Sequence, residues 1–196
     1  MNNKENNFES KIKSDINSHI NCCKNILSGN VVNIASAAVK IIQSLKLGGA
    51  IFWCGNGGSA SDSQHLNAEL IGRFEKDRPP LKSVALTTDT SVITALSNDY
   101  SYDLIFKRQL EALGKKGDVL VSISTSGESK NIINVLKEAK RKKITTISFL
   151  GKKGGKAKKY SNIAIIVPSD STARIQEMHI MIGQMICSLV EKNIFK

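Results

Sequence analysis

GDVLVSISTSGES, residues 117–129, combines three features of an α/β protein in one short stretch. The run 119–123 is continuously apolar apart from one serine, as expected of a strand buried on both faces of a parallel sheet. Four hydroxyl residues follow it directly, namely Ser124, Thr125, Ser126 and Ser129. A helix is predicted over 129–139. Hydroxyls and free backbone N–H groups at such a helix start can hold a phosphate, although ordinary N-capping by Ser129 is the alternative.

Similar apolar runs recur along the chain and alternate with helical periodicity. Strands are predicted over 50–54, 83–86, 119–123, 145–150 and 163–167, and helices over 59–72, 103–113, 129–139 and 172–191. This alternation predicts an α/β fold, a three-layer sandwich in which a five-stranded parallel sheet carries helices on both faces. Ligands of such sheets bind at the carboxyl ends of the strands, near the topological switch point.

The N-terminal part predicts two further helices, over about 8–27 and 31–47, which precede the first strand. Phe8, Ile12, Ile16 and Ile20 recur at helical spacing in the first of them. These helices are expected either to cover the sheet or to pack against another subunit. Together with the rest they predict a single domain over 1–196.

Composition narrows the classes of function. The 196 residues are 41% hydrophobic, contain no apolar run of membrane-spanning length and begin with a polar segment, so we expect a cytoplasmic protein without a membrane partner. The net charge is +11, but no aromatic residues interleave with the lysines, which argues against nucleic acid and suits an anionic small substrate. Cys22, Cys23, Cys54 and Cys187 have neither disulfide-framework nor zinc-finger spacing and predict structural thiols.

A second loop of small residues, CGNGGSAS at 54–61, follows the first predicted strand. Its glycines permit tight turns and a close ligand approach, although a plain strand-to-helix turn is the alternative. The loop lacks the lysine of a nucleotide P-loop and the dinucleotide fingerprint. Two such loops at one edge of a sheet favour a sugar-phosphate site more than either loop alone.

Polar residues on two helices are further candidates. His65 and Glu69 share a helical face and suit either a metal or a base with its orienting partner, whereas a solvated pair is the alternative. Gln176 and Gln184 are eight positions apart on the last helix, where surface or interface side chains are the alternative. His179 is more typical of a packed residue. Asn98-Asp99 suits either sugar hydroxyls or a turn.

Together, these segments resemble the sugar isomerase (SIS) domain family, with its flavodoxin-like fold, and within it the phosphoheptose isomerases. The matching segments are 54–60, 65–74 (HLNAELIGRF), 95–100, 117–129, 150–156 and 174–179 (RIQEMH). The resemblance implies a homotetramer with active sites at subunit interfaces. It also implies interconversion of sedoheptulose 7-phosphate and D-glycero-D-manno-heptose 7-phosphate through an enediol, the first step toward activated heptose for surface glycans such as lipopolysaccharide.

The resemblance also assigns residues. It implies substrate contacts at Asn56, Gly57, Gly58, Asn98, Asp99, Ser124, Thr125, Ser126, Ser129 and Gln176, and a Zn²⁺ ion on His65, Glu69, Gln176 and a histidine. In our hypothesis Glu69 is the catalytic base, which also contacts the substrate, and the serine loop anchors the phosphate.

This chain departs from the pattern at Gln184, which occupies the position of the family's catalytic and zinc-binding histidine. Glutamine does not titrate near neutral pH and is a poor zinc ligand. We therefore expect weak zinc binding at Gln184 and impaired turnover.

An alternative is a non-catalytic SIS-domain protein that binds the replication initiator. That relative also lacks the late histidine, but it lacks the glutamate of the H-x-x-x-E pair too and has a threonine in the first loop. This chain keeps Glu69 and Gly58, which favours the isomerases.

Overall fold

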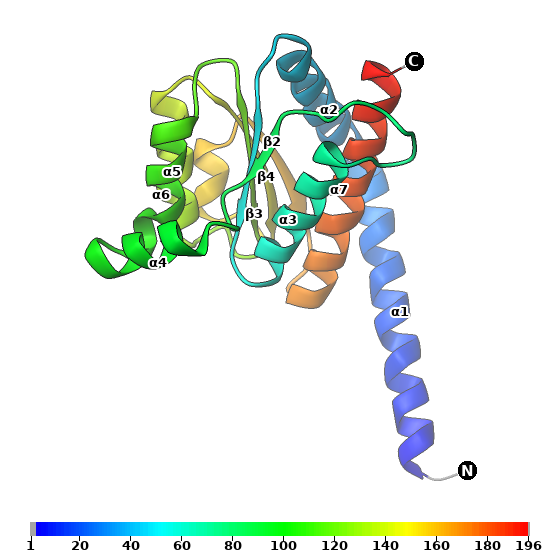
Figure 1. Cartoon of the computed structure of the whole chain (residues 1–196). Helices are drawn as coiled ribbons and strands as arrows, with labels where there is room; N and C mark the ends of the chain where they lie inside the picture. The colour runs from blue at the N-terminus through cyan, green and yellow to red at the C-terminus, as the bar shows by residue number, and fades with distance from the viewer. Residues whose placement is uncertain (1–2, 196) are drawn as a thin grey trace.

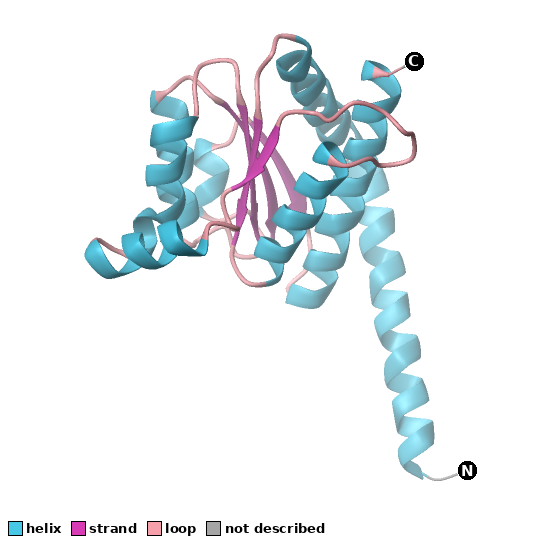
Figure 2. Ribbon diagram, viewed as in Figure 1, coloured by secondary structure: helices cyan, strands magenta, loops and turns pink. Residues whose placement is uncertain are grey.

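The computed structural model describes residues 3–195, which form a five-stranded parallel sheet between layers of helices (Figures 1 and 2). The strand order is β2-β1-β3-β4-β5, the flavodoxin-like order, with the switch point between β1 and β3. The strands are β1 (Ile51–Gly55), β2 (Ser83–Ala85), β3 (Val119–Ser124), β4 (Thr145–Gly151) and β5 (Ile163–Val167). This confirms the predicted fold class and all five predicted strands, with shifts of one residue at some ends.

The helices cover both faces of the sheet (Figure 2). They are α1 (Asn3–Gly29), α2 (Val31–Lys46), α3 (Gly58–Ile71), α4 (Thr90–Asp99), α5 (Ile105–Leu113), α6 (Lys130–Arg141) and α7 (Thr172–Ile194), with short 3-10 helices η1 (Tyr102–Leu104) and η2 (Lys156–Tyr160). One core lies under α2, α3 and α7, and a second lies under α5 and α6. Every residue of β1 and β3 is buried because both faces of these strands are covered.

The sequence pattern missed α4 and η2. α4 has no fully buried residue, and only Ile93 and Leu96 pack in part against the core, so the apolar stripe that reveals a packed helix is short here. Its N-terminus is capped instead by Asp89, whose carboxylate accepts a hydrogen bond from the Val92 N–H at 2.9 Å. Asn98 and Asp99 therefore lie at the end of a helix and not in an isolated turn.

α1 extends well beyond the sheet, and its first turns lie far from the strands (Figure 1). Phe8, Ile12 and Ile16 are exposed, whereas Cys22 and Ile26 near the other end of the helix are buried in the core. The first half of α1 does not cover the sheet, which leaves its apolar stripe open. No single helix within residues 3–195 is long and apolar enough to cross a membrane. α1 and α2 reach the necessary length and apolar content only when taken together, and the chain bends by 71° between them.

Candidate active site at the carboxyl edge of the sheet

The two loops of small residues lie side by side because β1 and β3 are neighbours. The strands pair in parallel from Ile51 with Val119 to Gly55 with Ile123. Each strand therefore delivers its loop to the same edge of the sheet, at the switch point where α/β proteins bind ligands. α3 and α7 both begin at this edge, the lower one in Figure 1.

The first loop depends on two glycines. Gly57 has φ +55° and ψ −124°, a conformation that residues with a Cβ rarely adopt. Gly58 matters for another reason, because a Cβ built on it would lie 2.4 Å from Nε2 of Gln176 on α7. The Gln176 amide therefore occupies the space that a side chain at position 58 would need.

Asn56 of the same loop is held by a polar network that the sequence did not reveal. Its Nδ2 donates to Oδ1 of Asn131 at 3.0 Å, and Nδ2 of Asn131 donates back to Oδ1 of Asn56 at 2.8 Å. The Tyr102 hydroxyl also donates to Oδ1 of Asn56, at 2.9 Å. Asn131 is buried on α6, so this pair joins the first loop to the helix that follows the second loop.

The second loop lines a small cavity of about 70 Å³. Its walls are Asn56, Ser59, Ile123, Ser124, Thr125, Ser126, Ser129 and Gln176. Six of the residues proposed to bind substrate are thus gathered around one space.

The geometry of this loop favours a ligand site over plain helix capping. Ser129 holds the N-cap position of α6, yet its side chain makes no cap hydrogen bond there. The hydroxyls of Ser124 and Ser126 accept from the N–H groups of Gly127 and Glu128, at 3.1 and 3.2 Å, and so order the loop. Hydroxyls beside the free N–H groups of a helix start suit a dianionic phosphate.

The second loop packs against the connection between β4 and β5. Gly127 has φ +65°, and a Cβ on it would lie 2.1 Å from the Gly154 carbonyl oxygen. The Ala157 N–H donates to the Gly127 carbonyl at 2.9 Å. Lys156 forms an ion pair with Glu128 at 3.1 Å, and its hydrogen bond holds the pKa of that carboxyl below its usual value. The lysine-bearing connection therefore packs against the loop that lines the cavity.

A second group of polar side chains lies between α3 and α7. His65 Nε2 is 2.9 Å from Oε1 of Glu69, and Nε2 of Gln184 is 3.2 Å from His65 Nε2 and 3.4 Å from the same Glu69 oxygen. The helices approach closely here because position 183 is glycine, where a Cβ would lie 2.4 Å from Cδ1 of Leu66. We call His65, Glu69 and Gln184 the α3–α7 trio.

The donors of this trio do not fit a zinc centre. At the four positions that the family resemblance implies, this chain offers one imidazole, one carboxylate and two amides, whereas zinc mostly takes histidine, cysteine and carboxylate ligands. The Gln176 amide lies against Gly58. Burial, with the Glu69 carboxylate nearby, raises the pKa of Cys187 to about 12, so its thiol is protonated at neutral pH. Within residues 3–195 no group of three His, Cys, Asp or Glu side chains suits a metal.

The remaining candidates lie apart from both groups. Asn98 and Asp99 are exposed, hydrogen-bond to each other at 2.8 Å and do not line the cavity. His179 is fully buried and packs against Phe149, with ring centroids 6.1 Å apart. Burial lowers the pKa of His179 to about 4, so its ring is neutral, which confirms its interpretation as a packed residue.

The fold and the two loops at its switch point define a SIS domain. The SIS domain family profile matches residues 16–151 of this chain. A phosphoheptose isomerase from Clostridium acetobutylicum is 51% identical over 186 residues, which cover 94% of this chain and 95% of that protein. One from Helicobacter pylori is 44% identical over 95% of this chain and 97% of its own length. The chain belongs to the phosphoheptose isomerase family of the SIS-domain proteins.

Solved structures agree with this assignment. A phosphoheptose isomerase from Neisseria gonorrhoeae superposes with a TM-score of 0.89 at 38% identity, covering 94% of this chain and 99% of that one. One from Francisella tularensis gives 0.90 at 37% identity, covering 93% and 97%. The alternative, a protein that binds the replication initiator, receives no support from these comparisons.

Proposed function

We propose that this chain interconverts sedoheptulose 7-phosphate and D-glycero-D-manno-heptose 7-phosphate, the first step toward activated heptose for surface glycans. The observation that carries the proposal is that α7 joins the two groups of site residues. Gln176 lines the hydroxyl cavity and Gln184 contacts Glu69. Eight residues of helix span about 12 Å, a length of the order of an extended seven-carbon sugar phosphate.

The phosphate is proposed to sit in the cavity of the second loop. Ser124, Thr125, Ser126 and Ser129 offer hydroxyls there, and the start of α6 adds backbone N–H groups. These donors are neutral, so their hydrogen bonds and the helix dipole, more than a paired cation, would hold the dianion. Asn56, Gly57 and Gly58 shape the wall of this site on the β1 side.

The proton transfer is proposed to be the task of Glu69. In the direction of aldose formation, its carboxylate takes a proton from C1 of the ketose while the C2 carbonyl oxygen gains one, giving the enediol. The carboxylic acid then returns its proton to C2, and the hydroxyl on C1 loses its proton to become the new carbonyl. His65, 2.9 Å away, holds the carboxylate in place.

We expect this chain to be slow in the proton transfer between the two substrate oxygens, O1 and O2. Moving a proton between O1 and O2 needs a group that can accept and release it, and the Gln184 amide does neither near neutral pH. The amide N–H of Gln184 can donate a hydrogen bond to the oxyanion that develops on the substrate, so part of the transition-state stabilisation is kept. We therefore propose slow turnover. Zinc, which in this family would polarise the substrate oxygens, is assigned no step here because the ligands do not fit it.

We also propose that the whole chain, 1–196, is one SIS domain that works in the cytoplasm as a homotetramer. Four free cysteines favour a reducing compartment. An apolar space of about 700 Å³ lies between α1, α2 and α7, with Leu27, Val31 and Met185 among its walls. Gln184 lines the same space, so a second subunit seated there would close over the α3–α7 trio. Met185→Glu is expected to yield smaller assemblies by sedimentation, and an unchanged mass would overturn this assignment.

The experiment for the activity compares the chain with Glu69→Gln by following both sugar phosphates in ³¹P and ¹³C NMR spectra. The substitution keeps the shape of the side chain but removes the base. We expect measurable conversion by the unaltered chain and none by the variant. Equal rates in both would remove Glu69 from the mechanism.

A further inference from the structure

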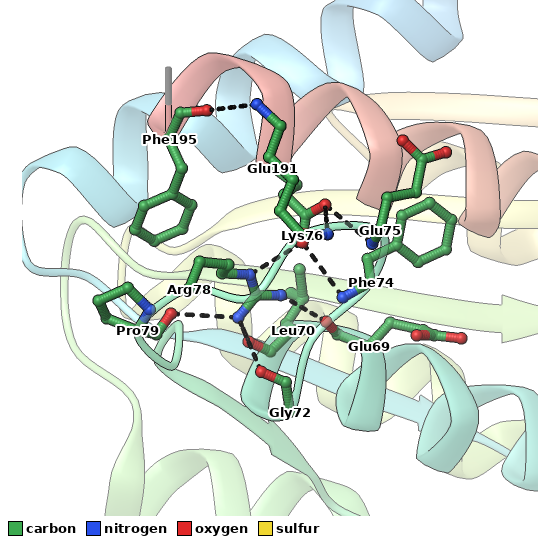
Figure 3. Close-up of polar contacts among 10 residues, drawn as sticks. All are labelled: Glu69, Leu70, Gly72, Phe74, Glu75, Lys76, Arg78, Pro79, Glu191 and Phe195. Atoms are coloured by element: carbon green, nitrogen blue, oxygen red, sulfur yellow. Dashed lines mark hydrogen bonds and ion pairs between the residues drawn. The ribbon is translucent and has the colours of Figure 1, made fainter.

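A buried ion pair that is not part of the α3–α7 trio lies close to the backbone of Glu69 (Figure 3). Arg78, in the loop between α3 and β2, pairs with Glu191 near the end of α7, with 3.0 Å between Nε and Oε2. The two side chains are only 2% and 1% exposed. Removing two charges from water is costly, and a buried pair often adds little net stability. Net stability alone therefore does not account for this pair.

Glu191 gathers the loop after α3 onto α7. Its carboxylate accepts hydrogen bonds from the backbone N–H groups of Phe74, Glu75 and Lys76, at 3.1, 2.9 and 2.8 Å, in addition to the Arg78 guanidinium. Burial alone would raise the pKa of Glu191, but these donors together hold it below its usual value. The carboxylate is therefore ionised at neutral pH and fixes the path of the loop.

Arg78 closes the C-terminal end of α3. Its Nη1 donates to the carbonyls of Leu70 and Gly72, at 2.7 and 3.2 Å, and to that of Pro79 at 3.2 Å. Its Nη2 donates to the carbonyl of Glu69 at 2.6 Å. The last carbonyls of a helix lack partners within the helix, and this one guanidinium supplies several. One of the carbonyls belongs to the proposed catalytic base itself.

The geometry of α7 relates this ion pair to the trio. Gln184 and Glu191 are seven residues apart, close to two helical turns, so both face α3. On one turn of α7, the Gln184 amide donates to the Glu69 carboxylate. Two turns further along, the Glu191 carboxylate accepts from Arg78, which in turn donates to the backbone carbonyl of Glu69. α3 and α7 are thus linked by two sets of hydrogen bonds, and Glu69 takes part in both.

We propose that Arg78 and Glu191 are positioning residues that set the aim of the Glu69 carboxylate relative to Gln184 and the substrate carbons. This inference rests on the proposed isomerase function. Misplacing a catalytic group by about 1 Å can cost roughly a hundredfold in rate. Most walls of the phosphate cavity come from the end of β3 and the loop after it, and none of its lining residues hydrogen-bonds to this pair, so substrate affinity is expected to survive its loss.

Arg78→Lys separates the positioning effect of the guanidinium from the effect of its positive charge. Lysine keeps the positive charge beside Glu191 but lacks the planar fork that reaches several carbonyls at once. We expect kcat to fall about ten- to a hundredfold with KM nearly unchanged. Glu191→Gln is the second variant. It removes the charge, keeps an acceptor oxygen, and is expected to give a smaller loss of the same kind.

Leu110→Ala on α5 is the matched control for lost stability. Leu110 is buried in the other core, so its truncation is expected to lower the melting temperature while kcat per folded molecule stays the same. The position of the trio is read independently from the ring signals of ¹³C-labelled histidine. The chain has only three histidines, and His65→Gln identifies the signal of His65.

The inference predicts that Arg78→Lys shifts the His65 ring signal and lowers kcat, whereas Leu110→Ala does neither. An unmoved His65 signal in both ion-pair variants would overturn it, as would an equal kcat loss in the control. If the unaltered chain does not convert sedoheptulose 7-phosphate, the proposed function fails. The histidine signals still test the positioning in that case.

Discussion

The amide nitrogen of Gln184 lies 3.4 Å from the carboxylate oxygen of Glu69, across the interface between α7 and α3. A side chain that does not titrate near neutral pH therefore lies beside the proposed base, at the position where the family resemblance implies a histidine. We expect this contact to set the zinc affinity and the turnover of the chain.

Zinc affinity is the first property that Gln184 should set. We expect the unaltered chain to bind zinc weakly, because His65 and Glu69 are the only ligands of the usual type in the proposed set. Gln184→His adds an imidazole 3.2 Å from His65 if it takes the place of the amide. Calorimetric titration should then give an affinity at least about tenfold higher for the variant. Equal affinities would place the zinc ligands elsewhere.

Loss of a phosphate donor should affect binding more than turnover. Ser124→Ala removes a hydroxyl from the cavity wall and should raise KM about tenfold or more, because hydrogen bonds to charged groups are worth about 1.5–3 kcal/mol. Ser44→Ala is the control. It removes a hydroxyl that donates to the Gly117 carbonyl at 2.7 Å, remote from the cavity. Steady-state kinetics showing the same KM for both variants would contradict the assignment of the phosphate cavity.

Gly58→Ala tests the place of Gln176. The new Cβ would lie 2.4 Å from the end of the flexible Gln176 side chain, which can move away without disturbing the backbone. We therefore expect a normal melting temperature and a loss of activity of about tenfold or more, on the scale of a misplaced site residue. Ala60→Gly, two residues further along α3, is a control for changes at the start of this helix. Full activity in Gly58→Ala would show that the position of Gln176 is unimportant.

The buried His179 should make the fold sensitive to mild acid. Its pKa falls from 6.5 to about 4 on folding, so the unfolded chain binds a proton between these values and the folded chain does not. Its contribution to stability is complete above about pH 6.5 and is lost as the pH falls toward 4, by about 3 kcal/mol in total. Urea unfolding at pH 7 and pH 4.5 measures this difference. His179→Phe should reduce the difference, and an unchanged pH dependence would rule out this histidine as its source.

Local pattern was sufficient to predict the sheet and the two loops. β1 and β3 are buried on both faces, so each appears in the sequence as an apolar run, interrupted only by Ser122 in β3, that ends in small polar residues. The strand order was implied only by the resemblance to the SIS family with its flavodoxin-like fold, because α/β proteins use more than one order. α4 was missed because its apolar stripe is short and only partly buried.

The parts of the site that were not predicted depend on contacts between distant residues. Asn56 and Asn131 are 75 positions apart, and Arg78 and Glu191 are 113 apart. Nothing in the composition near Arg78 indicates that its partner is the end of the last helix. The placement of Gln176 against Gly58 likewise follows from how α7 crosses α3, which spacing along one helix cannot show.

The most direct test of the isomerase function is turnover of sedoheptulose 7-phosphate by the unaltered chain, Gln184→His and Glu69→Gln under one set of conditions. We predict slow conversion by the unaltered chain, a gain of about a hundredfold in Gln184→His and no conversion by Glu69→Gln. Equal and rapid turnover by all three would contradict both the role of Glu69 and the importance of position 184.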